Sequence, residues 1–163
     1  MKKIINKKGF TLIELLAVIS ILAIIAVIAT PNIVTLVDNN KKQEFVTDAI
    51  SFTSKAVYKY KFEKYEDLFT VKDNCKIITL RNTGIEAKTD PDGNNYDLDN
   101  SIIKICEEEN NGLKEKVSYI LIKSTTTETD KRVRGIFDNN SSDKTVKVDS
   151  LGTKDVLDLK DLK

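Results

Sequence analysis

The chain has 163 residues, a formal net charge of +1, and 31% charged residues. This length allows one modest domain with an anchor, and charges of both signs suit a solvated surface. The sequence contains no histidine, which is the commonest general base and the commonest metal ligand. It also lacks the glycine-rich phosphate-binding motifs and the nucleophile elbow. We therefore expect neither an enzyme nor a cofactor.

A long apolar run near the N-terminus is the most informative stretch. Between Phe10 and Thr30 the only charged residue is Glu14, and a helix of about 20 mostly apolar residues is long enough to span a bilayer. An acid inside such a segment costs roughly 2.5–3.5 kcal/mol on insertion scales, and less near the interface. The run holds no Lys, Arg or His that would pair with it. A free amino terminus, created by a cut just before Phe10, would supply a positive partner.

The segment Gly9-Phe10-Thr11-Leu12-Ile13-Glu14-Leu15, with lysines before it and the apolar run after it, resembles the class III signal of the type IV pilin family. The resemblance implies that a prepilin peptidase cuts between Gly9 and Phe10 and then N-methylates Phe10. It also implies that Glu14 pairs with the terminal amine of an adjacent subunit during assembly. The apolar helix would anchor the subunit in the membrane first and form the filament core afterwards. An ordinary secretory leader or a plain membrane anchor would leave Glu14 unexplained.

These features divide the chain into a leader (residues 1–9), a hydrophobic transmembrane or filament-core helix (10–37) and an exported globular head (38–163). The head includes the second half of the long helix. All four lysines of the leader should remain cytoplasmic by the positive-inside rule, which places the head outside. Without the leader the chain has 22 basic and 25 acidic residues, a net charge of −3. Such a balance is no electrostatic footprint for nucleic acid.

Helical periodicity continues beyond the apolar run. The absence of Gly, and of any Pro after Pro31, favours one helix from Phe10 to about Glu66. Pro31 removes a backbone donor and predicts a kink or weak point, as in the pilin family; the alternative is that it only marks the membrane exit. Apolar and small residues at steps of three and four predict one buried face. That face comprises Val46, Ala49, Ile50, Thr53, Ala56, Val57 and Tyr60.

Short β-rich runs follow, separated by Asn, Asp and Gly. The expected strands are Cys75–Leu80, Ile102–Cys106, Val117–Lys123, Arg132–Phe137 and Thr145–Asp149. We expect the last three to form an antiparallel meander, with both faces of Val117–Lys123 partly buried. Gly84–Asn100 is expected to be a loop, and Asp155–Lys163 either a strand or a helical turn. The predicted fold class is α+β: a long helix, apolar and then amphipathic, packed on an antiparallel sheet as in pilins.

The chain has two cysteines, Cys75 and Cys106. An even pair in an exported domain indicates a disulfide, and antiparallel pairing of the two cysteine-bearing strands would bring the sulfurs together. The alternative is two buried thiols that behave as small apolar residues.

Two polar segments are candidate binding sites, one for a metal ion and one for nucleic acid. Alternating oxygens in Asp90–Asp99 suggest calcium, but the EF-hand spacing fails and Pro-Asp-Gly is a complete turn signal, so we expect no metal. Tyr58, Tyr60 and Tyr65 lie among lysines in a pattern that would stack bases. The simpler interpretation places Tyr60 in the core and the lysines on the solvated face.

The sequence therefore predicts a type IV pilin-like structural subunit, polymerised into a surface filament for adhesion or motility. Its expected partners are other copies, related pilins, a prepilin peptidase and N-methyltransferase, a pilus assembly platform and the membrane. One alternative is a minor pilin or pseudopilin of a type II secretion or DNA-uptake system. Another is a membrane-tethered binding module whose head recognises a ligand that the sequence does not identify.

Overall fold

The computed structural model describes residues 10–86, 89–126 and 132–162. The chain divides into two compact units, the first ending at Asp38 and the second running from Asn39. Helix α1 (Leu12–Tyr60) contributes to both units, and every strand belongs to the second. The predicted fold class, α+β with a long N-terminal helix and an antiparallel sheet, is confirmed. The predicted leader, residues 1–9, lies outside the described residues.

Helix α1 ends at Tyr60 rather than near Glu66. The amides of Lys61 and Phe62 donate to the carbonyls of Tyr58 and Lys59, at 3.2 and 3.1 Å. Such three-residue bonds tighten the last turn and end an α-helix. A separate 3₁₀ helix, Glu63–Leu68, then leads into the sheet.

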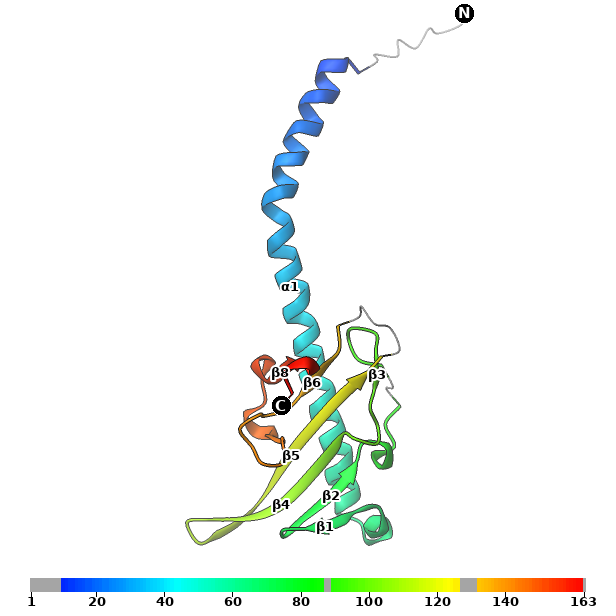
Figure 1. Cartoon of the computed structure of the whole chain (residues 1–163), viewed down its shortest axis with the longest axis vertical. Helices are drawn as coiled ribbons and strands as arrows, with labels where there is room; N and C mark the ends of the chain where they lie inside the picture. Colours follow the sequence, from blue (N-terminus) through cyan, green and yellow to red (C-terminus); the bar gives the residue numbers. More distant parts are fainter. Residues whose placement is uncertain (1–9, 87–88, 127–131, 163) are drawn as a thin grey trace, which may run out of the picture. The chain divides into compact units, whose positions relative to one another are not determined.

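The sheet has eight strands, and every neighbouring pair is antiparallel. Its path is β1-β2-β4-β5-β6-β8 (Figure 1). Strands β3 and β7 also pair with the 13-residue β5. The strands are β1 (Thr70–Lys72), β2 (Cys75–Thr79), β3 (Asn95–Tyr96), β4 (Ile102–Asn110), β5 (Leu113–Thr125), β6 (Arg134–Ile136), β7 (Val146–Lys147) and β8 (Val156–Asp158). Strands β1 and β3 were not predicted from the sequence. The extension of β4 to Asn110 and of β5 to Leu113 was not predicted either.

The expected meander of the last three predicted runs is wrong. Strand β6 pairs with β5 at Ile122–Lys123 and with β8, whereas β7 pairs with β5 at Tyr119–Ile120. Two short strands thus follow one another along the long β5, and the C-terminal tail completes the sheet as β8. The tail also forms a 3₁₀ turn at Leu159–Asp161, and another, Thr153–Asp155, leads into it. The segment Asp155–Lys163 therefore contains both a strand and a helical turn, the two structures predicted as alternatives.

One face of α1 packs on the sheet, but it is rotated from the predicted face. Val46, Ala49, Thr53 and Ala56 are buried as expected, and Val57 and Tyr60 pack against this core. Ile50, however, is 47% exposed. Phe45 and Phe52, absent from the predicted face, are buried in its place. The facing sheet residues are mainly isoleucines, among them Ile78, Ile103, Ile105, Ile120, Ile122 and Ile136.

Tyr96 explains this rotation. Its ring meets Phe45 and Phe52 edge-on, with centroids 5.4 and 5.3 Å away, and its hydroxyl donates to Asp48 at 2.6 Å. Burial, reinforced by this hydrogen bond and the Asp48 charge, raises the pKa of Tyr96 well above its ordinary value. Strand β3 is therefore fastened to the helix from within a segment, Gly84–Asn100, that was expected to be only a loop.

The opposite face of β5 is also covered, as the sequence predicted. Val117 and Leu121 are buried there and Tyr119 is half-buried. The Tyr119 hydroxyl donates to Glu108, and this bond together with burial raises the pKa of Tyr119 to about 12. Burial works to raise the pKa of Asp143 nearby, but hydrogen bonds from Lys104, Thr145 and Ser141 outweigh it and hold that pKa well below its usual range.

A disulfide joins Cys75 and Cys106. The two residues face each other as a register pair of β2 and β4, which is the strand pairing that the sequence suggested. Thirty-one positions separate them along the chain.

Removing this disulfide should destabilise the head. Closing a loop of this length contributes about 3–4 kcal/mol in the chain-entropy model. We expect the Cys75→Ser/Cys106→Ser double variant to unfold at a clearly lower temperature than the wild type, measured by circular dichroism. Reductant should lower the unfolding temperature of the wild type and leave that of the double variant unchanged. A wild-type unfolding temperature that does not change in reductant would contradict the disulfide.

Alkaline pH should weaken the head through Tyr96. Because its pKa is raised by folding, its contribution is complete below the unfolded value near 10 and is lost progressively above it. Above that unfolded value, a tyrosine whose pKa is raised by folding lowers the free energy of unfolding by up to about 1.4 kcal/mol per pH unit. Between pH 9 and 11, denaturant titrations should show a shallower decline for Tyr96→Phe than for wild type. Tyr58→Phe, at an exposed ring, is the control and should follow the wild type.

Candidate functional site

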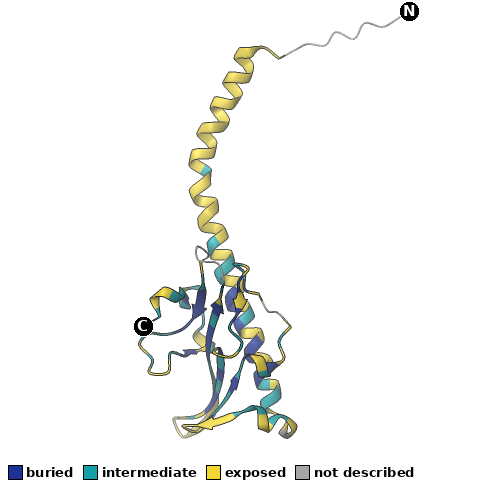
Figure 2. Cartoon of the chain, turned by 45° about the vertical axis from the view of Figure 1, so that its right-hand side comes forward, coloured by how far each residue is buried: buried dark blue, intermediate teal, exposed yellow. Residues whose placement is uncertain are grey.

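The N-terminal half of α1 carries a fully exposed apolar surface. Sixteen large apolar side chains between Leu12 and Val37 are 47–80% exposed (Figure 2). Helix α1, which contains this half, is the one helix among the described residues that is long and apolar enough to cross a membrane. Leaving these side chains in water would cost on the order of 20 kcal/mol, at about 25 cal/mol per Å². This segment therefore needs lipid or other apolar helices around it.

Its few polar side chains are satisfied within the helix. Ser20, Thr30 and Thr35 donate to the carbonyls of Leu16, Ala26 and Pro31, at 2.8, 2.6 and 3.1 Å. These back-bonds remove the cost of placing hydroxyls in an apolar medium. Pro31 itself lies inside α1, with helical residues on both sides. A kink there stays a prediction.

The start of the helix is a capping box built from Thr11 and Glu14. The Glu14 carboxylate oxygen Oε2 accepts hydrogen bonds from the Thr11 amide at 2.9 Å and from the Thr11 hydroxyl at 2.8 Å. In return, the Glu14 amide donates to the Thr11 hydroxyl oxygen Oγ1 at 3.3 Å. Thr11 also supplies the carbonyl for the first helical bond, from Leu15. This reciprocal pattern is the Thr-x-x-Glu capping box, which satisfies two otherwise unpaired amides.

The capping box corrects one step of the sequence argument. Glu14 was expected to have no partner within its own run, since only charged partners were considered there. Thr11 is a neutral partner, and the Thr-x-x-Glu spacing of the sequence is typical of this cap. The second carboxylate oxygen, Oε1, makes no hydrogen bond to any described residue.

The other predicted processing residues lie just before the helix. Gly9 is outside the described residues, and Phe10 is the first described residue, non-helical and 82% exposed. The bond expected to be cut thus immediately precedes an exposed residue and a capped helix. Cleavage, methylation and the pairing of Glu14 with a neighbour's amine stay predictions.

The Asp90–Asp99 segment is held by cations of the protein itself. Asp90 accepts from the amides of Asp92 and Asn94 at 2.9 and 2.8 Å. Asp92 lies between Lys41 of α1 and Arg134 of β6, with ion-pair distances of 3.1 and 3.0 Å. No group of three or more His, Cys, Asp or Glu side chains among the described residues could hold a metal ion. The segment acts as a tie between helix and sheet.

The tyrosines and lysines near the end of α1 contact one another. Lys76 and Lys116 lie over the Tyr60 ring, at 5.4 and 4.6 Å from its centroid. Tyr60 also packs edge-on against Phe69 and against the core. This ring is therefore occupied by cation–π and core contacts and offers no free face for a base.

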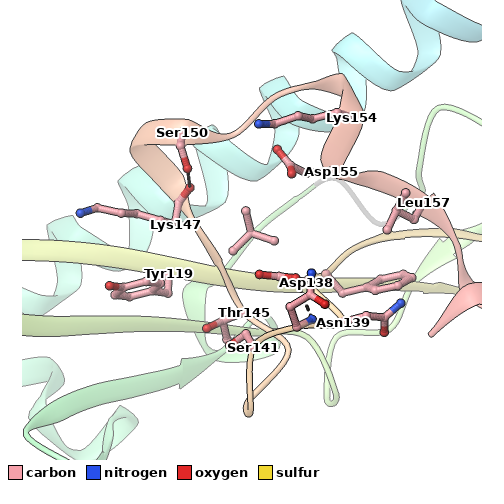
Figure 3. A pocket seen from close by; sticks show the side chains of 13 residues that line it. Tyr119, Asp138, Asn139, Ser141, Thr145, Lys147, Ser150, Lys154, Asp155 and Leu157 are labelled. Atoms are coloured by element: carbon pink, nitrogen blue, oxygen red, sulfur yellow. Dashed lines mark hydrogen bonds between the residues drawn. The ribbon is translucent and has the colours of Figure 1, made fainter. Parts of the chain in front are cut away.

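A polar hollow of about 550 Å³ lies beside β7 (Figure 3). Among its lining side chains, Asp138 and Asp155 are acidic and Lys147 and Lys154 are basic. Equal numbers of opposite charges give the hollow no preference for an anionic or a cationic ligand. The N-terminal segment remains the feature with the most specific chemistry.

Comparison with known proteins supports that choice. The family model described as the prokaryotic N-terminal methylation motif matches residues 5–30. No curated protein and no solved structure matches the chain. The matched residues contain Gly9, Phe10, the capping box and most of the exposed apolar helix. The chain thus carries the class III signal peptide of type IV pilins, which supports a pilin-like or pseudopilin protein and implies processing by a prepilin peptidase.

Proposed function

We propose that this protein is a structural subunit of a type IV pilin-like surface filament that serves adhesion or motility, and that it has no enzymatic role. The observation that carries the proposal is the exposed apolar half of α1, joined to a processing motif at one end and a folded, disulfide-bonded head at the other. The motif and the helix fit a membrane-anchored precursor. In the proposed second stage the helices of many copies leave the bilayer together.

The energetics of the apolar half support direct transfer from lipid into a shared helical core. Exposure to water would cost on the order of 20 kcal/mol per copy. A bundle of like helices removes this cost, because each supplies the apolar cover that the others need. The internally bonded hydroxyls of Ser20 and Thr30 suit either environment equally well.

The geometry of Glu14 supports its proposed pairing with the Phe10 amine of a neighbouring copy. Oxygen Oε2 is used by the cap of its own helix, and the other oxygen is left for an external donor. Cleavage before Phe10 would create an ammonium group on the residue that precedes the cap. In the proposed filament core this carboxylate would be buried, and since it already accepts two hydrogen bonds, it would need only this one charge to be neutralised.

Substitution of Glu14 should separate anchoring from assembly. We expect Glu14→Ala to be cleaved and to remain in the membrane, while sheared filament falls about tenfold or more, since losing one partner of a desolvated charge pair costs about 2–5 kcal/mol. The matched variant Thr11→Val removes only the cap, worth about 0.5–2 kcal/mol, and should still assemble. Immunoblots of sheared and membrane fractions make the measurement. Wild-type filament yield from Glu14→Ala would refute the pairing.

Substitution of Gly9 tests the processing site. An arginine before the cut should not fit a peptidase that reads glycine there, so Gly9→Arg should accumulate as the full precursor. Intact-mass spectrometry of the wild type should find an N-terminus at Phe10 with one added methyl group. A mature-length Gly9→Arg product would show that the cut lies elsewhere.

A further inference from the structure

The tip of the β4–β5 hairpin extends beyond the rest of the sheet (Figure 1). Strand β2 reaches β4 only as far as Cys106, and β7 reaches β5 only from Tyr119. Residues 107–116 therefore form a two-stranded ribbon, closed by Asn111 and Gly112 with φ of 52° and 79°, the type I′ geometry. A ribbon of this kind adds little to its own core and is marginally stable alone.

The two faces of this ribbon differ in charge pairing. On the face toward α1, Glu107 and Glu109 oppose Lys116 and Lys114, which are favourable cross-strand pairs. On the outer face, Glu108 directly opposes Glu115, and like charges so placed are destabilising. Leu113 lies on that outer face, two residues from Glu115, and is 67% exposed. The outer face thus presents an apolar knob beside two acids that lack a cation opposite them, and one of these, Glu108, accepts a hydrogen bond from the Tyr119 hydroxyl.

The head also carries a surface with the complementary properties. A shallow groove of about 390 Å³ lies between α1 and the 3₁₀ turn Val148–Ser150, with Ile50, Val57 and Tyr58 on the helix side and Val148 on the other. Ile50 and Tyr58 are 47% and 58% exposed. Lys61 is the one charged side chain that lines the groove. From Ala49 to Phe62 the chain has three lysines and no acid.

The knob of one chain does not face the groove of the same chain. The ribbon's other face is the one turned to α1, since Lys116 lies 4.6 Å from the centroid of the Tyr60 ring. Leu113 and Glu115 point the opposite way across the ribbon. We propose that the outer face of the β4–β5 tip docks into the Ile50–Tyr58 groove of a second copy, with Leu113 in the groove and Lys61 beside Glu108 and Glu115.

This contact joins two different surfaces of identical chains. It is heterologous, and a heterologous contact that does not close into a ring repeats indefinitely as a helical filament. The inference therefore rests on the proposed function and adds to it a lateral contact between heads. It assigns a role to the protruding ribbon, which the head's own core does not require, and to the exposed Ile50 and Tyr58 of the groove.

Cysteine crosslinking in the full-length chain tests the contact. Both native cysteines are bonded to each other, so introduced thiols are the free ones. Cells producing Leu113→Cys and Ser54→Cys chains together, oxidised mildly, should yield a reductant-sensitive mixed dimer, and a chain with both substitutions should yield a ladder. The control pairs Leu113→Cys with Val71→Cys, at an exposed site on β1 away from the groove. No more dimer than this control in either the sheared or the membrane fraction would overturn the proposal.

Charge reversal provides an independent measurement. Lys61→Glu and Glu115→Lys, each added to the crosslinking pair, should lower the dimer yield about two- to fivefold, and their combination should restore it. Glu115→Lys removes the opposed acids, so it should also raise the melting temperature of the chain by about 1–4 °C. Two single reversals that leave the yield unchanged would contradict the docking.

The outcomes separate this inference from the proposed function. Abundant sheared filament without the Leu113–Ser54 crosslink would reject the contact while leaving the filament intact. Crosslinked dimers confined to membranes, with no sheared material, would keep the contact and reject the filament.

Discussion

The whole molecule depends on one constraint: the apolar half of α1 cannot remain in water. Sixteen large side chains with no cover in the part of the chain that the structure describes require a lipid or protein environment. The head does not share this requirement, because its own half of α1 is covered by the sheet and tied there by Tyr96 and the Lys41–Asp92 ion pair. One helix therefore has an apolar half that needs an apolar environment and a second half that packs on the sheet of the head. The first half ends near Asp38, where polar residues replace the apolar ones.

The N-terminus of that helix combines a structural and a chemical role in two residues. In a membrane the first amides of a helix have no water to bond, so a local cap is valuable. Thr11 and Glu14 supply it. The same carboxylate is the only charge in the run. A cap made by an acid, rather than by a neutral side chain, carries a negative charge that the cap itself does not neutralise, and this distinguishes the segment from an ordinary anchor.

Much of the fold followed from periodicity, whereas its details depended on contacts that are distant in sequence. The apolar run, the strands around Cys75, Cys106 and Val117, and the two covered faces of β5 could be predicted because each is a local pattern. The rotation of the buried helix face could not, since it depends on Tyr96, about fifty residues after Phe45. Strands β6 and β7 both pair with residues inside the predicted strand Val117–Lys123, so the local pattern of that strand did not decide their arrangement. The Asn111-Gly112 turn signal extends β4 and β5 by four further register pairs. That signal and Thr-x-x-Glu were legible in the sequence and were missed.

The disulfide has a mechanical consequence. A chain held by its N-terminal helix and pulled at the surface of its head would transmit the load through the head. The Cys75–Cys106 bond removes the chain between these residues from any extension, which is about 100 Å of contour length at 3.3–3.6 Å per residue. Even a head that has lost its packing would thus yield less under tension, and strands β2 and β4 would stay linked until the covalent bond itself was broken.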